Sequence, residues 1–119
     1  MDAYLTDSKG TPVLSTGFNE YSFRGTSSVT GGDNIFSSDI TPKRSGSPPA
    51  FLVIITPAAD GVLSAVYTAT AGARTSKLMG GATLTTGVEY PVMAYPFGGE
   101  TVNFTFSATG AHVITVREV

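Results

Sequence analysis

The chain has 119 residues, a formal net charge of −2 and charged side chains at only 13% of its positions. This length allows one ordinary domain with a single core. Seven basic residues are too few to neutralise a phosphate backbone, so we expect no nucleic acid partner, and the absence of cysteine excludes disulfides, thiolate metal sites and a cysteine nucleophile.

The sequence also lacks an obvious membrane segment. Its longest apolar run, residues 50–55, is far shorter than the roughly 20 residues that span a bilayer. The start Met1-Asp2 is followed by neither a basic region nor an apolar stretch, so no signal peptide is expected. We therefore expect a protein made in the cytoplasm, with no membrane partner.

Residues 1–50 differ in composition from the rest of the chain. They hold 14 apolar residues, against 35 among the 69 residues of 51–119. Glycine, serine and proline interrupt the segment repeatedly, which is typical of loops. Two stretches, 12–15 and 18–24, have the composition of short strands. We predict that residues 1–50 form an extended N-terminal arm with one or two short strands.

This arm keeps apolar side chains that disordered tails usually lack, so these side chains should find a buried place. The stretch 18–23 can pack on the chain's own core or on a neighbouring chain, and the sequence leaves both open. A second group lies between two loop-forming stretches, which favours an intermolecular contact. The predicted interface residues of the arm are Ile35, Phe36 and Ile40.

Residues 51–119 consist of short strand-like stretches. The run 51–56 is continuous and rich in β-branched residues, which predicts a strand buried on both faces and ended by Pro57. After a turn at Asp60-Gly61, strands are expected over 62–69 and 75–79. Further on, Pro91 indicates an edge strand or a bulge.

The last strands show the clearest pattern. Residues 101–107 alternate between apolar and polar side chains, and Thr109-Gly110 predicts a turn back into 113–116, so we expect a terminal β-hairpin. No stretch has an apolar stripe at helical spacing, so we expect little or no helix. The predicted core consists of Leu52, Ile54, Val66, Val102, Phe104, Phe106, Ile114 and Val116.

Together these patterns predict an all-β protein. Short strands joined by glycine-rich turns are typical of a single β-sandwich or jelly roll, here with six to eight strands. The predicted domain organisation is an N-terminal arm over residues 1–50 and a β-sandwich core over residues 51–119.

The residues that catalysis requires are few and scattered. His112 is the sole histidine and begins a strand, and no G-x-S-x-G motif accompanies it, so we interpret it as a turn or edge residue. A pair of carboxylates could serve a glycosidase, and the candidates are Glu89, Glu100 and Glu118. Glycosidases usually stack the sugar on aromatic side chains, and this short chain has no tryptophan. Glu100 is explained as a solvated turn residue. We predict that the protein is not an enzyme.

Metal and cofactor sites are equally poorly supported. The nearest approach to a calcium loop is Asp33-Asn34 with Asp39, but the spacing fits no known loop and turn chemistry explains these residues. The glycine pairs lack the spacing of phosphate-binding loops. We expect no metal and no cofactor.

Aromatic side chains suggest binding instead. The chain contains five tyrosines and seven phenylalanines. Tyr95 and Phe97 flank Pro96 beside a turn, where they are candidates for exposure to solvent. Exposed aromatic side chains anchor protein interfaces because they offer a large, rigid contact area. The alternative is that both rings cap the core.

Two stretches also carry a family resemblance. Residues 80–90 read GGATLTTGVEY, and residues 99–104 read GETVNF. This pattern resembles small virion proteins of tailed bacteriophages, in particular head decoration (cement) proteins, over roughly residues 60–119.

The resemblance implies a structural protein located in the virion. Such a protein binds the outside of an assembled capsid, often as a homotrimer, and bridges subunits of the major capsid protein. A phage tail or fibre component fits the same resemblance. The alternative from another functional class is a carbohydrate-binding β-sandwich module whose tyrosines stack on sugar.

Overall fold

The computed structural model describes residues 4–6, 12–14, 22–25, 28–43 and 49–119. This part of the chain contains nine strands and one short 3-10 helix, in the order β1 (Tyr4–Thr6), β2 (Pro12–Leu14), β3 (Ser22–Gly25), β4 (Phe51–Thr56), β5 (Leu63–Ala69), β6 (Gly72–Lys77), η1 (Leu78–Gly81), β7 (Tyr90–Ala94), β8 (Thr101–Phe106) and β9 (Val113–Glu118). The prediction of an all-β protein with almost no helix is confirmed.

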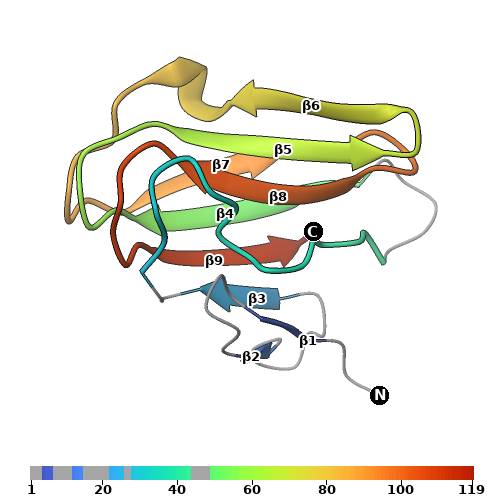
Figure 1. Ribbon diagram of the computed structural model, residues 1–119, viewed down its shortest axis with the longest axis horizontal. Coiled ribbons are helices and arrows are strands. Elements are labelled where there is room, and N and C mark those ends of the chain that lie inside the picture. Colours follow the sequence, from blue (N-terminus) through green and yellow to red (C-terminus); the bar gives the residue numbers. More distant parts are fainter. Residues whose placement is uncertain (1–3, 7–11, 15–21, 26–27, 44–48) are drawn as a thin grey trace.

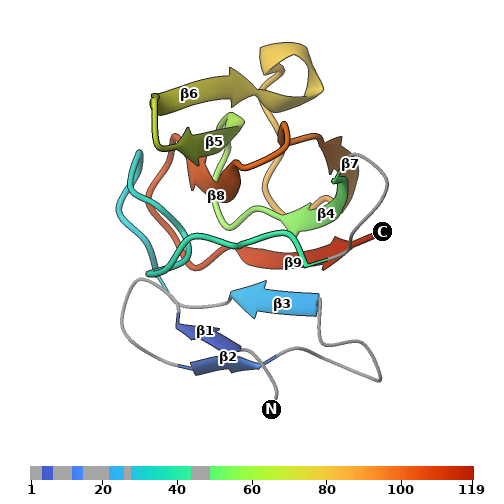
Figure 2. The same cartoon turned by 90° about the vertical axis from the view of Figure 1, so that its right-hand side faces the viewer.

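The strands form three antiparallel sheets. The largest has the order β3-β9-β4-β7, the next has the order β6-β5-β8, and β1 pairs with β2. Figures 1 and 2 show β6 at one margin of the molecule, with β3, β1 and β2 on the opposite side. Strand β7 is an edge strand, as Pro91 predicted.

The two larger sheets share one hydrophobic core. In the centre of the four-stranded sheet, Val53 pairs with Val92 on one side and Val116 on the other. From the three-stranded sheet, alternate residues of β5 and β8 join the same cluster. Predicted members that are buried are Val102, Phe104, Phe106, Ile114 and Val116.

Three predicted core residues were assigned to the wrong face of their strands. Leu52 and Ile54 are half-buried, whereas the other face of β4 is fully buried. Val66 is likewise half-buried on β5. The run 51–56 has apolar side chains on both faces, so alternation could not identify the inner one. The buried residues of these two strands are Phe51, Val53, Ile55, Leu63, Ala65 and Tyr67.

The predicted terminal hairpin does not form. Strand β8 pairs with β5, whereas β9 pairs with β3 and β4, so the connection after β8 crosses from one sheet to the other. Along this connection Gly110 exchanges two backbone hydrogen bonds with Val29. His112 then donates from Nε2 to the Ala108 carbonyl and accepts at Nδ1 from the Ala58 N–H. Contacts with distant segments therefore replace the expected local turn.

Residues 1–50 do not form a separate arm in the part that the structure describes. Strand β3 pairs with β9 inside the four-stranded sheet. The segment 28–43 runs beside β8, where Ile35 and Ile40 form backbone hydrogen bonds with Phe104 and Val102. The predicted boundary at residue 50 is therefore wrong, because this segment covers the outer edge of β8. The predicted strand stretch 18–21 lies outside the described residues.

The predicted interface residues of the arm are also corrected. Ile35, Phe36 and Ile40 are 2%, 1% and 1% exposed and belong to the chain's own core. Their apolar character serves folding rather than an intermolecular contact. Within the described residues, no helix is long and apolar enough to cross a membrane.

Candidate protein-binding site

An aromatic loop between β7 and β8 carries the two most exposed large apolar side chains of the described residues. Tyr95 is 60% exposed and Phe97 is 67% exposed, while Pro96 between them is buried. The loop closes with a turn in which the Glu100 N–H donates to the Phe97 carbonyl. Gly99 has φ of 83° in this turn, a conformation that favours glycine. The sequence left open whether these rings are exposed or cap the core, and the structure shows that both are exposed.

A half-buried ion pair holds this loop against β6. The Arg74 guanidinium donates from Nη2 to Glu100 Oε1 at 2.9 Å and from Nε to Glu100 Oε2 at 3.0 Å. The same carboxylate accepts a hydrogen bond from the Phe97 N–H at 2.6 Å. Glu100 is only 9% exposed, so its interpretation as a solvated turn residue is wrong. The two-point geometry fixes the loop as a unit.

Aromatic rings surround the arginine. The Arg74 guanidinium carbon lies 4.0 Å from the ring centroid of Tyr67 and 4.1 Å from that of Phe97. Tyr67 is buried in the core, and its hydroxyl accepts a hydrogen bond from the Tyr95 N–H. Arg74 therefore connects a core ring to an exposed ring.

Each member of the Arg74–Glu100 pair stabilises the charged form of the other. The hydrogen bonds from Arg74 hold the pKa of the Glu100 carboxyl below its ordinary value. Reciprocally, the hydrogen bonds to Glu100 raise the pKa of Arg74. Burial raises the pKa of the Tyr67 hydroxyl. At neutral pH both members of the pair are thus ionised.

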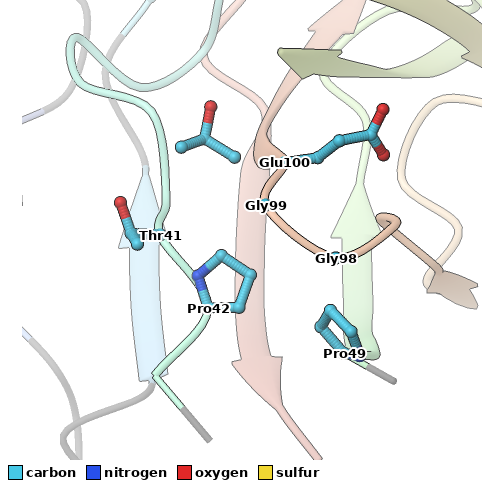
Figure 3. Close-up of a pocket in the computed structure, with 7 residues that line it drawn as sticks. Thr41, Pro42, Pro49, Gly98, Gly99 and Glu100 are labelled. Carbon is cyan, nitrogen blue, oxygen red and sulfur yellow. The ribbon is translucent and has the colours of Figure 1, made fainter. Parts of the chain in front are cut away.

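Two hollows flank the loop. One, of about 300 Å³, is lined by Thr41, Pro42, Pro49, Gly98, Gly99, Glu100 and Thr101. Figure 3 shows the Glu100 side chain running away from Thr41 and Pro42, so two prolines, two glycines and two threonines form most of the lining. The other, of about 250 Å³, lies at the β5–β6 turn and includes Arg74 and Glu100.

Two other buried polar side chains, His112 and Glu118, form hydrogen bonds within the fold. His112 is 2% exposed, both of its ring nitrogens form hydrogen bonds, and its ring packs 4.3 Å from that of Phe106. It is a buried residue of the inter-sheet connection rather than the expected turn or edge residue. Glu118 is also buried and accepts a hydrogen bond from the Lys43 N–H.

The weak calcium candidate does not assemble in the structure. Asp39 accepts hydrogen bonds from Asn103 Nδ2 and from the Thr101 hydroxyl. Across the part of the chain that the structure describes, no group of three or more histidine, cysteine, aspartate or glutamate side chains is placed to hold a metal ion.

Sequence reasoning identified Tyr95 and Phe97 but missed the residues that hold them. Arg74 and Tyr67 are paired across the β5–β6 hairpin, which places them on the same face of the sheet. This pairing could have been found by counting outward from the turn between the two strands. The Arg74–Glu100 contact joins residues 26 positions apart, and no local pattern indicates it.

Comparison of the chain with family models, curated proteins and solved structures gave no match.

Proposed function

We propose that the two larger sheets form a β-sandwich that serves as a non-catalytic structural module and binds a neighbouring protein through the aromatic loop 95–100. Together with the resemblance of residues 60–119 to decoration proteins, this makes the protein a component of a phage head, bound to the outside of the capsid. The proposal includes a homotrimer that bridges subunits of the major capsid protein.

The observation that carries the proposal is the exposure of Tyr95 and Phe97 on a loop that is held rigidly. An exposed aromatic side chain has few rotatable bonds, so its burial at an interface costs little side-chain entropy. A loop that is already fixed loses little backbone entropy on binding. The hydrogen bonds of Glu100 with Arg74 and Phe97 supply that rigidity. The hollow that Gly98 and Gly99 of the loop line together with Pro42 and Pro49 offers a place for an apolar side chain of the partner.

A carbohydrate-binding module is the second candidate, because exposed rings can stack on sugars. Sugar recognition also needs free polar side chains around the rings. Arg74 and Glu100 are the charged residues next to the rings, and they bind each other. This pairing favours a protein partner, and a glycan array separates the two candidates.

The proposal is tested by sedimentation with capsid shells. Wild-type protein and the variants Tyr95→Ala and Phe97→Ala are mixed with shells assembled from the major capsid protein of the same virus. Each aromatic truncation should weaken binding by about tenfold or more, corresponding to about 1.4 kcal/mol or more at an interface anchor. The bound fraction is measured in the pellet.

Val113→Ala serves as the control, because Val113 is an exposed apolar side chain on a different strand. It should bind shells as the wild type does. Wild-type protein that stays in the supernatant at all concentrations, or that binds arrayed glycans through Tyr95, would refute the capsid proposal.

A further inference from the structure

Strand β6 has a free edge. In the part of the chain that the structure describes, it pairs with β5 on one side and has no strand on its other side, at the outer margin of the molecule (Figure 1). The opposite edge of this sheet, on β8, is covered by the segment 28–43. Strand β7, the edge of the other large sheet, contains Pro91, which cannot donate a hydrogen bond. Among these three edges, β6 is the one that remains competent to pair.

The composition of β6 allows a second strand to approach. Its six residues, GARTSK, include no proline. The side chains on its exposed face are Ala73, Thr75 and Lys77, of which the first two are small. A row of unpaired backbone N–H and C=O groups is satisfied best by another extended strand.

We propose that this partner strand is β6 of a second copy of the chain. The two strands run antiparallel around a two-fold axis at Thr75, so that the two sheets join into one sheet of twice as many strands. In this register Arg74 lies opposite Ser76, and Lys77 lies opposite Ala73, so like charges do not face each other. A threonine pair on the axis is a favourable cross-strand contact. The two-fold operation uses the same edge of both copies, so assembly through this contact stops at a dimer and adds no further strands.

Exposed apolar side chains at the two ends of β6 support this pairing. Phe97 packs against Arg74 near the start of the strand, and Met79 follows two positions after its end. They are 67% and 40% exposed. Antiparallel pairing brings the Phe97 end of one copy next to the Met79 end of the other, at both ends of the contact. Each exposed apolar group thereby approaches an apolar neighbour.

The expected affinity is modest. One strand pair with two flanking contacts buries less than the roughly 1,200 Å² of a standard stable interface, so the dissociation constant should lie in the micromolar range. The dimer does not depend on the proposed function. It is compatible with a trimer, because a two-fold contact can join copies that belong to neighbouring trimers on a shell.

The test is charge reversal on the axis, followed by light scattering after size exclusion across the micromolar range. Thr75→Lys and Thr75→Glu each place two like charges opposite each other. For each variant alone, the dissociation constant of the dimer should therefore rise at least about fivefold. An equimolar mixture of the two variants should regain the dimer. Thr30→Lys changes an exposed threonine away from β6 and should dimerise as the wild type does.

Hydrogen exchange provides a second measurement. Backbone amides of residues 72–77 should become more protected in the wild type as its concentration rises, and in Thr75→Lys they should not. A wild type that stays monomeric throughout, a dimer that both Thr75 variants retain, or a mixture that fails to recover would each overturn the proposal. Shell binding takes no part in this experiment, so its outcome is independent of the capsid proposal.

Discussion

At the residue scale, Asn103 is the buried polar side chain that attaches the segment 28–43 to β8. Its Oδ1 accepts hydrogen bonds from the N–H groups of Phe36 and Phe104, and its Nδ2 donates to the Phe36 carbonyl and to Asp39. Asn103 and Phe36 are each 1% exposed, so water cannot replace the amide at the Phe36 backbone groups. The amide thus satisfies both backbone groups of Phe36.

Asn103→Ala should therefore reduce the free energy of unfolding by about 2–5 kcal/mol, because it leaves buried backbone groups without partners. Urea denaturation measures the change. Asn103→Asp keeps the shape but places a second carboxylate beside Asp39, and it should also destabilise the protein at neutral pH. Asn34→Ala, at an exposed asparagine nearby, should change stability by less than about 0.5 kcal/mol. Equal stability of Asn103→Ala and wild type would contradict this role.

Glu100 predicts a pH dependence of stability. Because its pKa is lower in the folded protein than in the unfolded chain, its ionised form favours folding. This contribution is complete above the ordinary glutamate pKa of about 4.3 and is lost as the pH falls through the lower folded value. The stability gap between wild type and Glu100→Gln should thus be constant from neutral pH to about pH 5 and should shrink at lower pH.

Thermal unfolding at a series of pH values measures this gap. Glu89→Gln, at an exposed glutamate outside the cluster, is the matched control and should follow the wild type. A gap between wild type and Glu100→Gln that stays unchanged down to pH 2 would show that the Arg74 contact does not act through the charge of Glu100.

At the element scale, the segment 28–43 and the connection after β8 approach each other at glycine positions. A Cβ atom at Gly31 would lie 2.5 Å from the Ser107 carbonyl oxygen, which belongs to the backbone and cannot rotate away. A Cβ at Gly61 would lie 2.6 Å from the ring of Phe106. The approach at Gly31 lets the segment 28–43 take the place of a strand beside β8, whereas Gly61 brings the connection between β4 and β5 against the end of β8.

Gly31→Ala should accordingly destabilise the protein by about 1–3 kcal/mol, since the segment must move away from β8. Gly98→Ala is the matched control, because a Cβ there meets nothing within 4 Å. Its effect should stay within about 0.5 kcal/mol. Chemical denaturation of both variants gives the comparison, and equal stabilities would contradict the close packing at Gly31.

At the scale of the whole molecule, the first and second halves of the chain build one core. Four side chains of the segment 28–43 lie inside it: Val29, Ile35, Phe36 and Ile40. Burying a side chain of this type contributes about 1.5–3 kcal/mol, so together they contribute about 6–12 kcal/mol. This is comparable to the whole stability of an ordinary domain.

Removal of residues 1–43 should therefore abolish folding, whereas an independent arm would leave residues 51–119 folded. The truncated chain should show no cooperative thermal transition by circular dichroism, and it should aggregate through the uncovered edge of β8. A truncated chain that unfolds cooperatively near the wild-type temperature would instead support a separable arm.

Local patterns predicted much of the fold. The alternation in 101–107 identified the buried side of β8, and Pro91 indicated an edge strand or a bulge, of which the structure shows the edge. Both signals act within a single strand. The turn beside Tyr95 and Phe97 made their exposure one of two alternatives, and only the structure decided against rings that cap the core. The face of β4 was not predictable, because both of its faces are apolar and only the facing sheet determines which is buried.

The sequence by itself determined that this protein is built from short strands, since period-two alternation and glycine-rich turns are properties of neighbouring residues. Tertiary structure alone decided how those strands pair: β8 and β9 enter different sheets, the segment 28–43 covers β8, and Arg74 meets Glu100. These contacts join residues far apart in the chain, and their free energy comes from burial and from satisfied hydrogen bonds that exist only once the core has formed. Such contacts leave no periodic trace in the sequence.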